Sequence, residues 1–69
     1  MTLDSKYEQF KQALIIRIQE DIDKSEQRAD AHRQGNRLEA LAFEKGLKNA
    51  LITTLFDINE LDHNYYNQQ

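Results

Sequence analysis

The sequence predicts an all-α fold, an antiparallel two-helix hairpin that is expected to dimerise into a four-helix bundle. The chain has no proline and only two glycines, its apolar residues recur every three or four positions, and Gly35 interrupts that pattern near mid-chain. A composition so poor in turn-forming residues disfavours a β fold, and the helical spacing disfavours disorder. Residues 1–69 are short enough to form a single helical-hairpin domain.

The segment around Gly35 predicts the turn between the helices. Gly35 can take the left-handed conformation that ends a helix. Asn36 can then cap the next helix, with Glu39 three residues further on to complete a capping box. A turn this short makes consecutive helices pack antiparallel. We therefore expect helix 1 at about 5–34, the turn at 35–36, helix 2 at about 37–63 and a frayed tail at 64–69.

Each predicted helix carries one apolar stripe that would face the other helix. The stripe of the first helix comprises Leu3, Tyr7, Phe10, Leu14, Ile18, Ile22, Ser25, Ala29 and His32. The stripe of the second comprises Ala40, Phe43, Leu47, Leu51, Thr54, Ile58, Leu61 and Tyr65. In an antiparallel hairpin centred on the turn, residues whose numbers sum to about 71 should lie opposite one another.

Four apolar residues midway along the hairpin fall off both stripes and predict an interaction surface: Ile15, Ile16, Ile52 and Phe56. Burying each would contribute about 1.5–3 kcal/mol, and a contiguous exposed apolar patch usually marks a binding surface. Short chains without disulfides often gain stability by oligomerisation, and this chain has no cysteine. We expect this surface to form a homodimer, which Phe56→Asp would disrupt, or to bind a different protein.

Glu44 falls close to the centre of the predicted apolar face of the second helix, where a carboxylate needs a partner. Arg28 is the nearest basic residue across the predicted register, so the two are expected to form a polar pair that fixes the register. Alternatively, Glu44 could act as an acid or base together with His32. No nucleophile or oxyanion site accompanies them, so the sequence predicts no catalytic residue and no enzyme.

Glu60 and His63 have the Glu-x-x-His spacing of carboxylate-bridged metal bundles, in which residues one helical turn apart share a metal. Such sites need the motif twice, and a dimer would supply two copies. The motif occurs once in the chain, next to the end that is expected to fray. We expect no metal and no cofactor, and a dimeric carboxylate/histidine metal-binding bundle remains the second alternative function.

The segment 35–47 resembles the start of a tetratricopeptide repeat, with its glycine-asparagine turn, the pair Glu39-Ala40 and the run Phe43-Glu44-Lys45. Gly46 stands where that family usually has alanine, and the repeat period does not recur in the chain. The resemblance implies a helical hairpin. The length and hairpin plan are also similar to those of the plasmid-encoded RNA-binding dimers of the Rop type. That similarity gives the first alternative function, a helical dimer that binds nucleic acid.

The charge balance favours a protein partner. Nine basic and twelve acidic residues give a net charge of −3, which weakens attraction to nucleic acid and to anionic membranes. The start of the chain lacks the pattern of a signal peptide, so a cytoplasmic location is expected. The sequence thus predicts a non-enzymatic protein–protein interaction module, a small self-associating regulator or accessory protein of bacteria or phages. Its expected partners are a second copy of itself and an unidentified protein.

Overall fold

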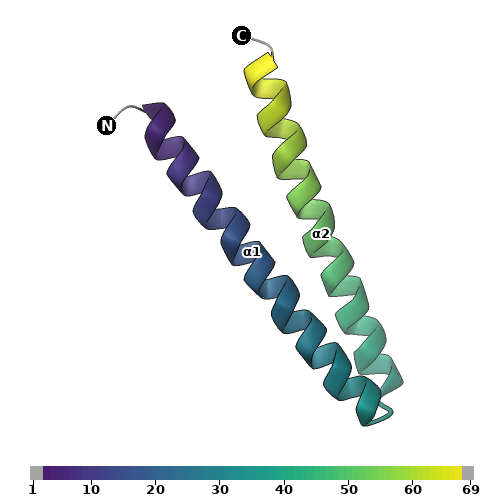
Figure 1. The fold of residues 1–69 in the computed structure, drawn as a ribbon. Coiled ribbons are helices and arrows are strands. Elements are labelled where there is room, and N and C mark those ends of the chain that lie inside the picture. Colours follow the sequence, from purple (N-terminus) through teal and green to yellow (C-terminus); the bar gives the residue numbers. More distant parts are fainter. Residues whose placement is uncertain (1–2, 68–69) are drawn as a thin grey trace.

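The computed structural model describes residues 3–67, with side chains from Ser5 to Tyr65, and shows two long helices joined by a tight turn (Figure 1). Helix α1 spans Leu3–Gln34 and helix α2 spans Leu38–Asn67. They pack against each other as an antiparallel hairpin, which confirms the predicted all-helical fold. The Cα atoms span 51 × 23 × 9 Å, so the hairpin is a single layer of helices with two broad faces.

The turn differs from the predicted one in the residue that takes the left-handed conformation. Asn36 has a φ of 58°, whereas Gly35 has no positive φ. The Asn36 amide donates to the Arg33 carbonyl at 3.2 Å, and the Arg37 amide donates to the His32 carbonyl at 2.9 Å. These are the two hydrogen bonds of a Schellman motif. Asn36 therefore ends α1 instead of capping α2, because asparagine tolerates the left-handed region.

Gly35 leaves space for the side chain of Arg37. A Cβ atom on this residue would lie against the guanidinium of Arg37, with Cζ only 2.9 Å away. That guanidinium donates to the Ala31 carbonyl at 3.1 Å and, through Nε, to Nδ1 of His32 at 2.9 Å. The absence of a side chain at Gly35 thus lets a positive charge lie at the C-terminus of α1, where the helix dipole favours cations.

The helix ends also differ from the expected ones. Residues 64–67, expected to fray, belong to α2, and α1 begins at Leu3 instead of residue 5. Segment 64–67 contains no glycine or proline that would interrupt the backbone hydrogen bonds of the helix. Arg37, expected as the first residue of the second helix, lies in the turn. Residues 68–69 of the predicted tail lie outside the described part of the chain.

The line along which the helices touch is shifted from the predicted stripes. On α1 the buried and half-buried contact positions are Lys11, Ile15, Ile18, Ile22, Ser25, Ala29 and His32. On α2 they are Leu41, Glu44, Lys48, Leu51, Leu55, Ile58 and Asp62. Both lines alternate steps of three and four without a break, as coiled-coil-like packing requires.

Several residues predicted for this contact were therefore assigned wrongly. Phe10 is 68% exposed and Leu61 is 70% exposed, and Phe43, Thr54 and Tyr65 are exposed as well. In the predicted stripe of α1, several residues in succession are four positions apart. Repeated steps of four move a stripe around the helix, so it leaves the straight contact line. Leu3, also assigned to that stripe, has a side chain outside the described part.

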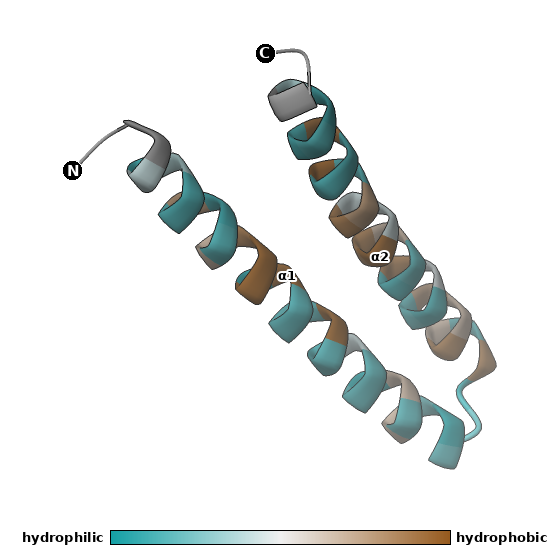
Figure 2. Ribbon diagram, turned by 45° about the horizontal axis from the view of Figure 1, so that its top comes forward, coloured by the Kyte–Doolittle hydropathy of each residue, from teal (hydrophilic) through white to brown (hydrophobic). Residues whose placement is uncertain are grey.

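The hairpin buries few of its apolar residues. Among the described side chains the buried apolar ones are Ile18 and Ala29, and the buried polar ones are Ser25 and Glu44. The large apolar side chains that stay exposed are Tyr7, Phe10, Leu14, Ile16, Leu38, Phe43, Phe56, Leu61 and Tyr65. Figure 2 shows apolar segments along both helices. Most of the other large apolar side chains are only half-buried, so the hairpin leaves many apolar groups in contact with water.

Candidate functional site

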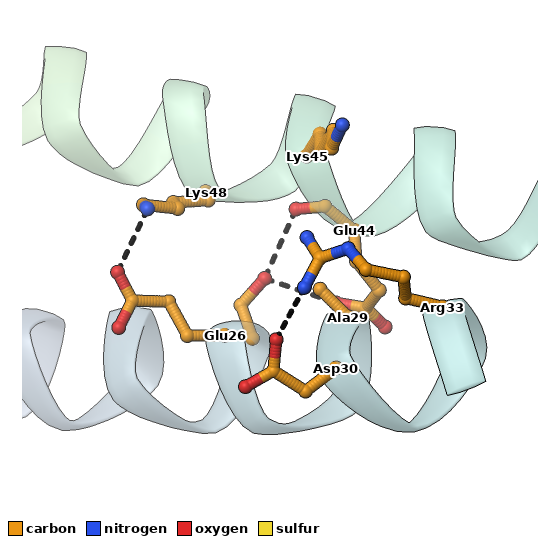
Figure 3. A pocket seen from close by; sticks show the side chains of 8 residues that line it. Glu26, Ala29, Asp30, Arg33, Glu44, Lys45 and Lys48 are labelled. Carbon is orange, nitrogen blue, oxygen red and sulfur yellow. Dashed lines mark hydrogen bonds and ion pairs between the residues drawn. The ribbon is translucent and has the colours of Figure 1, made fainter.

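The hairpin has two broad faces, which the contact line separates. Glu26 directly follows Ser25 of the contact line, and Lys45 directly follows Glu44. Glu26 and Lys45 line the same cavity, of about 230 Å³, so both project to one face (Figure 3). Lys48 joins them there, with its Nζ 2.7 Å from Oε1 of Glu26. We call this surface the Glu26 face.

The opposite surface, which we call the Phe10 face, carries the residues that directly precede contact positions. Phe10 precedes Lys11 on α1, and Leu61 precedes Asp62 on α2. One residue rotates an α-helix by about 100°, so residues before and after a contact position project to opposite faces. The large apolar residues of the Phe10 face are Phe10, Leu14, Phe43, Leu47 and Leu61. All except the half-buried Leu47 are exposed.

The four residues of the predicted interaction surface are divided by the structure. Ile15 lies on the contact line, and Ile15 and Ile52 are both half-buried within the hairpin. Ile16 is 53% exposed and Phe56 is 69% exposed, so these two can contact another molecule. Ile16 lies at the outer edge of α1 and directly follows Ile15, as Phe56 directly follows Leu55, so both project toward the Glu26 face. Two of the four residues are therefore exposed and two are half-buried, and the role of the four in binding stays a prediction.

Near the turn, the contact line contains a buried polar cluster. Arg28 Nε donates to Oε1 of Glu44 at 2.8 Å, which brings together the pair expected from the sequence. Ser25 Oγ lies 3.0 Å from Oε2 of Glu44. The hydrogen bond from Arg28 lowers the pKa of Glu44 below its usual value, with a further contribution from Ser25, and burial opposes this. A carboxylate with a lowered pKa is a weak base, so the cluster is suited to holding the helices together.

The cavity beside this cluster has walls of both charges (Figure 3). Arg33 Nη1 lies 2.6 Å from Oδ1 of Asp30, and Lys48 is paired with Glu26 across the helices. Because these cations are already matched by neighbouring carboxylates, the cavity offers no concentrated charge that would select one kind of ion.

A second polar cluster connects the helices at the end far from the turn, where the ribbons draw apart (Figure 1). Lys11 Nζ lies 2.9 Å from Oδ2 of Asp62, and the Tyr7 hydroxyl donates to Oδ1 of Asp62 at 2.8 Å. The hydrogen bond from Lys11 lowers the pKa of Asp62, and Tyr7 adds to the effect. The same pairing raises the pKa of Lys11.

Sequence reasoning missed Lys11 and Asp62 because the stripes were traced through apolar residues. The sequence nevertheless contains a pattern that identifies this pair. Continuing the alternation of three and four backwards from Ala29 and Ser25 reaches Lys11, which bears a charge opposite to that of Asp62 across the predicted register.

Glu60 and His63, the pair considered for metal binding, are both exposed on the last turns of α2. Between residues 5 and 65, where side chains are described, no group of three or more histidine, aspartate and glutamate side chains could hold a metal ion. The structure therefore adds no ligands to the pair.

Comparison with protein-family models, with curated proteins and with solved structures found no match. Within the described residues, neither helix has a stretch that is long and apolar enough to cross a membrane.

Proposed function

We propose that this chain is a self-associating helical interaction module, in which two hairpins pack face to face as a four-helix bundle. The observation that carries the proposal is a contrast among the described side chains: two apolar residues, Ile18 and Ala29, are buried, whereas nine large apolar ones stay exposed. Large apolar side chains that are left exposed in such number favour association with another surface. These 69 residues contain no cysteine, so disulfides cannot complete a core for them.

The dimensions of the hairpin are sufficient for a stable dimer. A standard protein–protein interface buries about 800 Å² on each partner. The Cα trace of the hairpin extends over 51 × 23 Å, and the chain has 5522 Å² of accessible surface. One broad face therefore supplies the necessary area, and a second layer of helices would convert the thin hairpin into a bundle with an interior.

A second copy of the chain is the partner that this surface favours. A two-fold interface brings the same patch of both copies together, so the patch must be self-complementary. The Phe10 face meets this requirement because it has apolar residues on both helices. Its charged residues are the basic Arg17, Lys24 and Arg28 and the acidic Asp21 on α1, and the acidic Asp57 on α2. The polar clusters of Glu44 and Asp62 form hydrogen bonds within the hairpin, which supports a structural rather than a catalytic role.

The test is the molar mass in solution, measured by light scattering across a dilution series, with helicity followed by circular dichroism on the same samples. We expect twice the chain mass of 8.2 kDa at high concentration. Dissociation on dilution accompanied by loss of helicity would also support the proposal, because the bundle would then be needed for folding. A fully helical monomer at every concentration would overturn it.

A further inference from the structure

The polar cluster at the end far from the turn lies beyond the well-buried part of the hairpin. We propose that Tyr7, Lys11 and Asp62 form a latch that closes the far ends of the two helices, residues 5–14 of α1 and 59–65 of α2. These far ends open and close as a unit while the rest of the hairpin stays folded. The hairpin thus has a closed state, in which Asp62 is held by both donors, and an open state, in which the far ends are separated.

Burial within the hairpin is concentrated on the side of the turn, in residues 15–58, which we call the near-turn half. The buried side chains among those described are Ile18, Ser25, Ala29 and Glu44. Ile18 lies nearest to the far ends, and it follows Lys11 by about two helical turns. Between them the contact line has Ile15, which is only half-buried. The ribbons also draw apart toward the far ends (Figure 1), so apolar packing stabilises the near-turn half more than the far ends.

The latch joins the helices through one carboxylate. Lys11 Nζ lies 2.9 Å from Oδ2 of Asp62, and the Tyr7 hydroxyl donates to Oδ1 of Asp62 at 2.8 Å. The side chains of Lys11 and Asp62 are 13% and 19% exposed, so water has partial access to the pair. Lys11 Nζ also lies 3.2 Å from Oε2 of Glu8 on its own helix. When the latch opens, Lys11 therefore keeps a carboxylate partner and Asp62 is solvated, so opening leaves no buried charge without a partner.

The cluster near the turn cannot open in the same way. Glu44 is 6% exposed, and the Ser25 side chain that contacts it is fully buried. Ser25 lies on the contact line between Ile18 and Ala29, which are buried as well. Separation of the helices at this level would break all of these contacts together. The near-turn half therefore opens only when the whole hairpin unfolds, whereas the latch opens from the end.

Separated helix ends lose their helical hydrogen bonds. The far ends span residues 5–14 and 59–65, which is less than the roughly 12–15 residues that an isolated helix needs in water. Packing against the opposite helix is therefore what keeps these ends helical. Opening of the latch exposes the backbone amides of both far ends to solvent, while those of the near-turn half stay protected.

Hydrogen exchange of the full chain, followed amide by amide by NMR, tests the latch. We expect the amides of the far ends to exchange faster than those of the near-turn half. Their exchange should also depend little on low concentrations of urea, because local opening exposes little surface. The same exchange free energy and the same urea dependence in both regions would overturn the proposal, since the hairpin would then open only as a whole.

Two substitutions should have different effects on the two regions. Asp62→Asn weakens the closed state relative to both the open and the unfolded state, so amides of both regions should exchange about 2- to 5-fold faster. Ser25→Ala weakens a contact that the closed and open states share. The near-turn amides should then exchange about 5- to 30-fold faster, as expected for a lost hydrogen bond to a buried carboxylate. The far-end amides should change by less than about 2-fold.

Asp57→Asn is the matched control, because it makes the same change of charge at an exposed position of α2. It should leave exchange in both regions unchanged. Equal acceleration of both regions by Ser25→Ala would overturn the proposal. So would unchanged exchange of residues 5–14 in Asp62→Asn, because α1 would then fray without regard to the latch. The urea dependence of the unmodified chain decides the question even where Ser25→Ala fails to fold, and light scattering on the same samples tests self-association separately.

Discussion

Ser25 Oγ lies 3.0 Å from the carboxylate Oε2 of Glu44 and 3.0 Å from the backbone carbonyl oxygen of the same residue. Both residues are buried, and together they occupy positions of the helix contact line that an apolar residue would usually fill. Arg28 completes the cluster from the exposed side. A polar cluster in a contact line favours one register of the helices, because any slip would leave a buried carboxylate without its donors.

Ser25→Ala tests the contribution of the buried hydroxyl. The substitution removes one of the hydrogen-bond donors of a buried carboxylate, and hydrogen bonds to charged groups contribute about 1.5–3 kcal/mol. Alanine favours the helix slightly, so we expect a net loss of about 1–2 kcal/mol in the free energy of unfolding. Urea denaturation at fixed protein concentration measures it. Thr53→Ala, at an exposed position of α2, is the control, and an equal effect of both substitutions would contradict the expectation.

The stability of the protein should decrease in acid. The hydrogen bond from Arg28 lowers the pKa of Glu44, and that from Lys11 lowers the pKa of Asp62. Both carboxylates therefore bind protons more weakly in the folded chain than in the unfolded chain. Their contribution to the free energy of unfolding is complete at pH values above their ordinary pKa values of 4.5 and 3.8. It is lost as the pH falls through the lowered pKa values of the folded chain.

Urea denaturation between pH 7 and 3 would measure this dependence. We expect the free energy of unfolding to fall below about pH 4.5. In the double variant Glu44→Gln, Asp62→Asn, the slope in this range should be clearly smaller. An unchanged slope would show that other groups cause the acid sensitivity.

Ile18→Ala should cost more stability than Ile16→Ala. Ile18 is 7% exposed on the contact line, whereas Ile16 is 53% exposed at the outer edge of α1. Truncation of a buried isoleucine costs about 2–5 kcal/mol, and the thin core places Ile18 at the lower end of that range. We expect less than about 1 kcal/mol for Ile16, typical of a surface site. Thermal and urea unfolding would compare the two, and equal losses would place Ile16 in a buried contact of the assembled protein.

Gly46→Ala should stabilise the protein. Gly46 lies inside α2, and a Cβ atom built there meets no atom within 4 Å. Alanine in a helix is more favourable than glycine by about 0.8–1 kcal/mol, so a gain of about 1 kcal/mol is expected in the free energy of unfolding. Loss of stability, or weaker self-association by light scattering, would instead show that another helix approaches Gly46 closely in the dimer.

The sequence by itself determined the hairpin. The absence of proline, the spacing of the apolar residues and the Gly35-Asn36 pair were sufficient to predict two long helices and a tight turn. The register followed from the position of the turn, and it brought Arg28 within 2.8 Å of Glu44. These features are local or depend on one short connection, so the sequence constrains them directly.

Only the tertiary structure decided which side of each helix faces the other. Phe10 and Leu61 belong to the predicted stripes. These stripes share several residues with the observed contact line, and elsewhere they run about one residue to the side of it. Burial of apolar residues alone does not choose between such stripes, because the chain has apolar residues on several sides of both helices. The choice depends on polar contacts between distant residues, those of Ser25 with Glu44 and of Lys11 with Asp62. Lys11 and Asp62 are found in the sequence only by following the alternation of three and four residues and pairing opposite charges across the register, because apolar stripes bypass them.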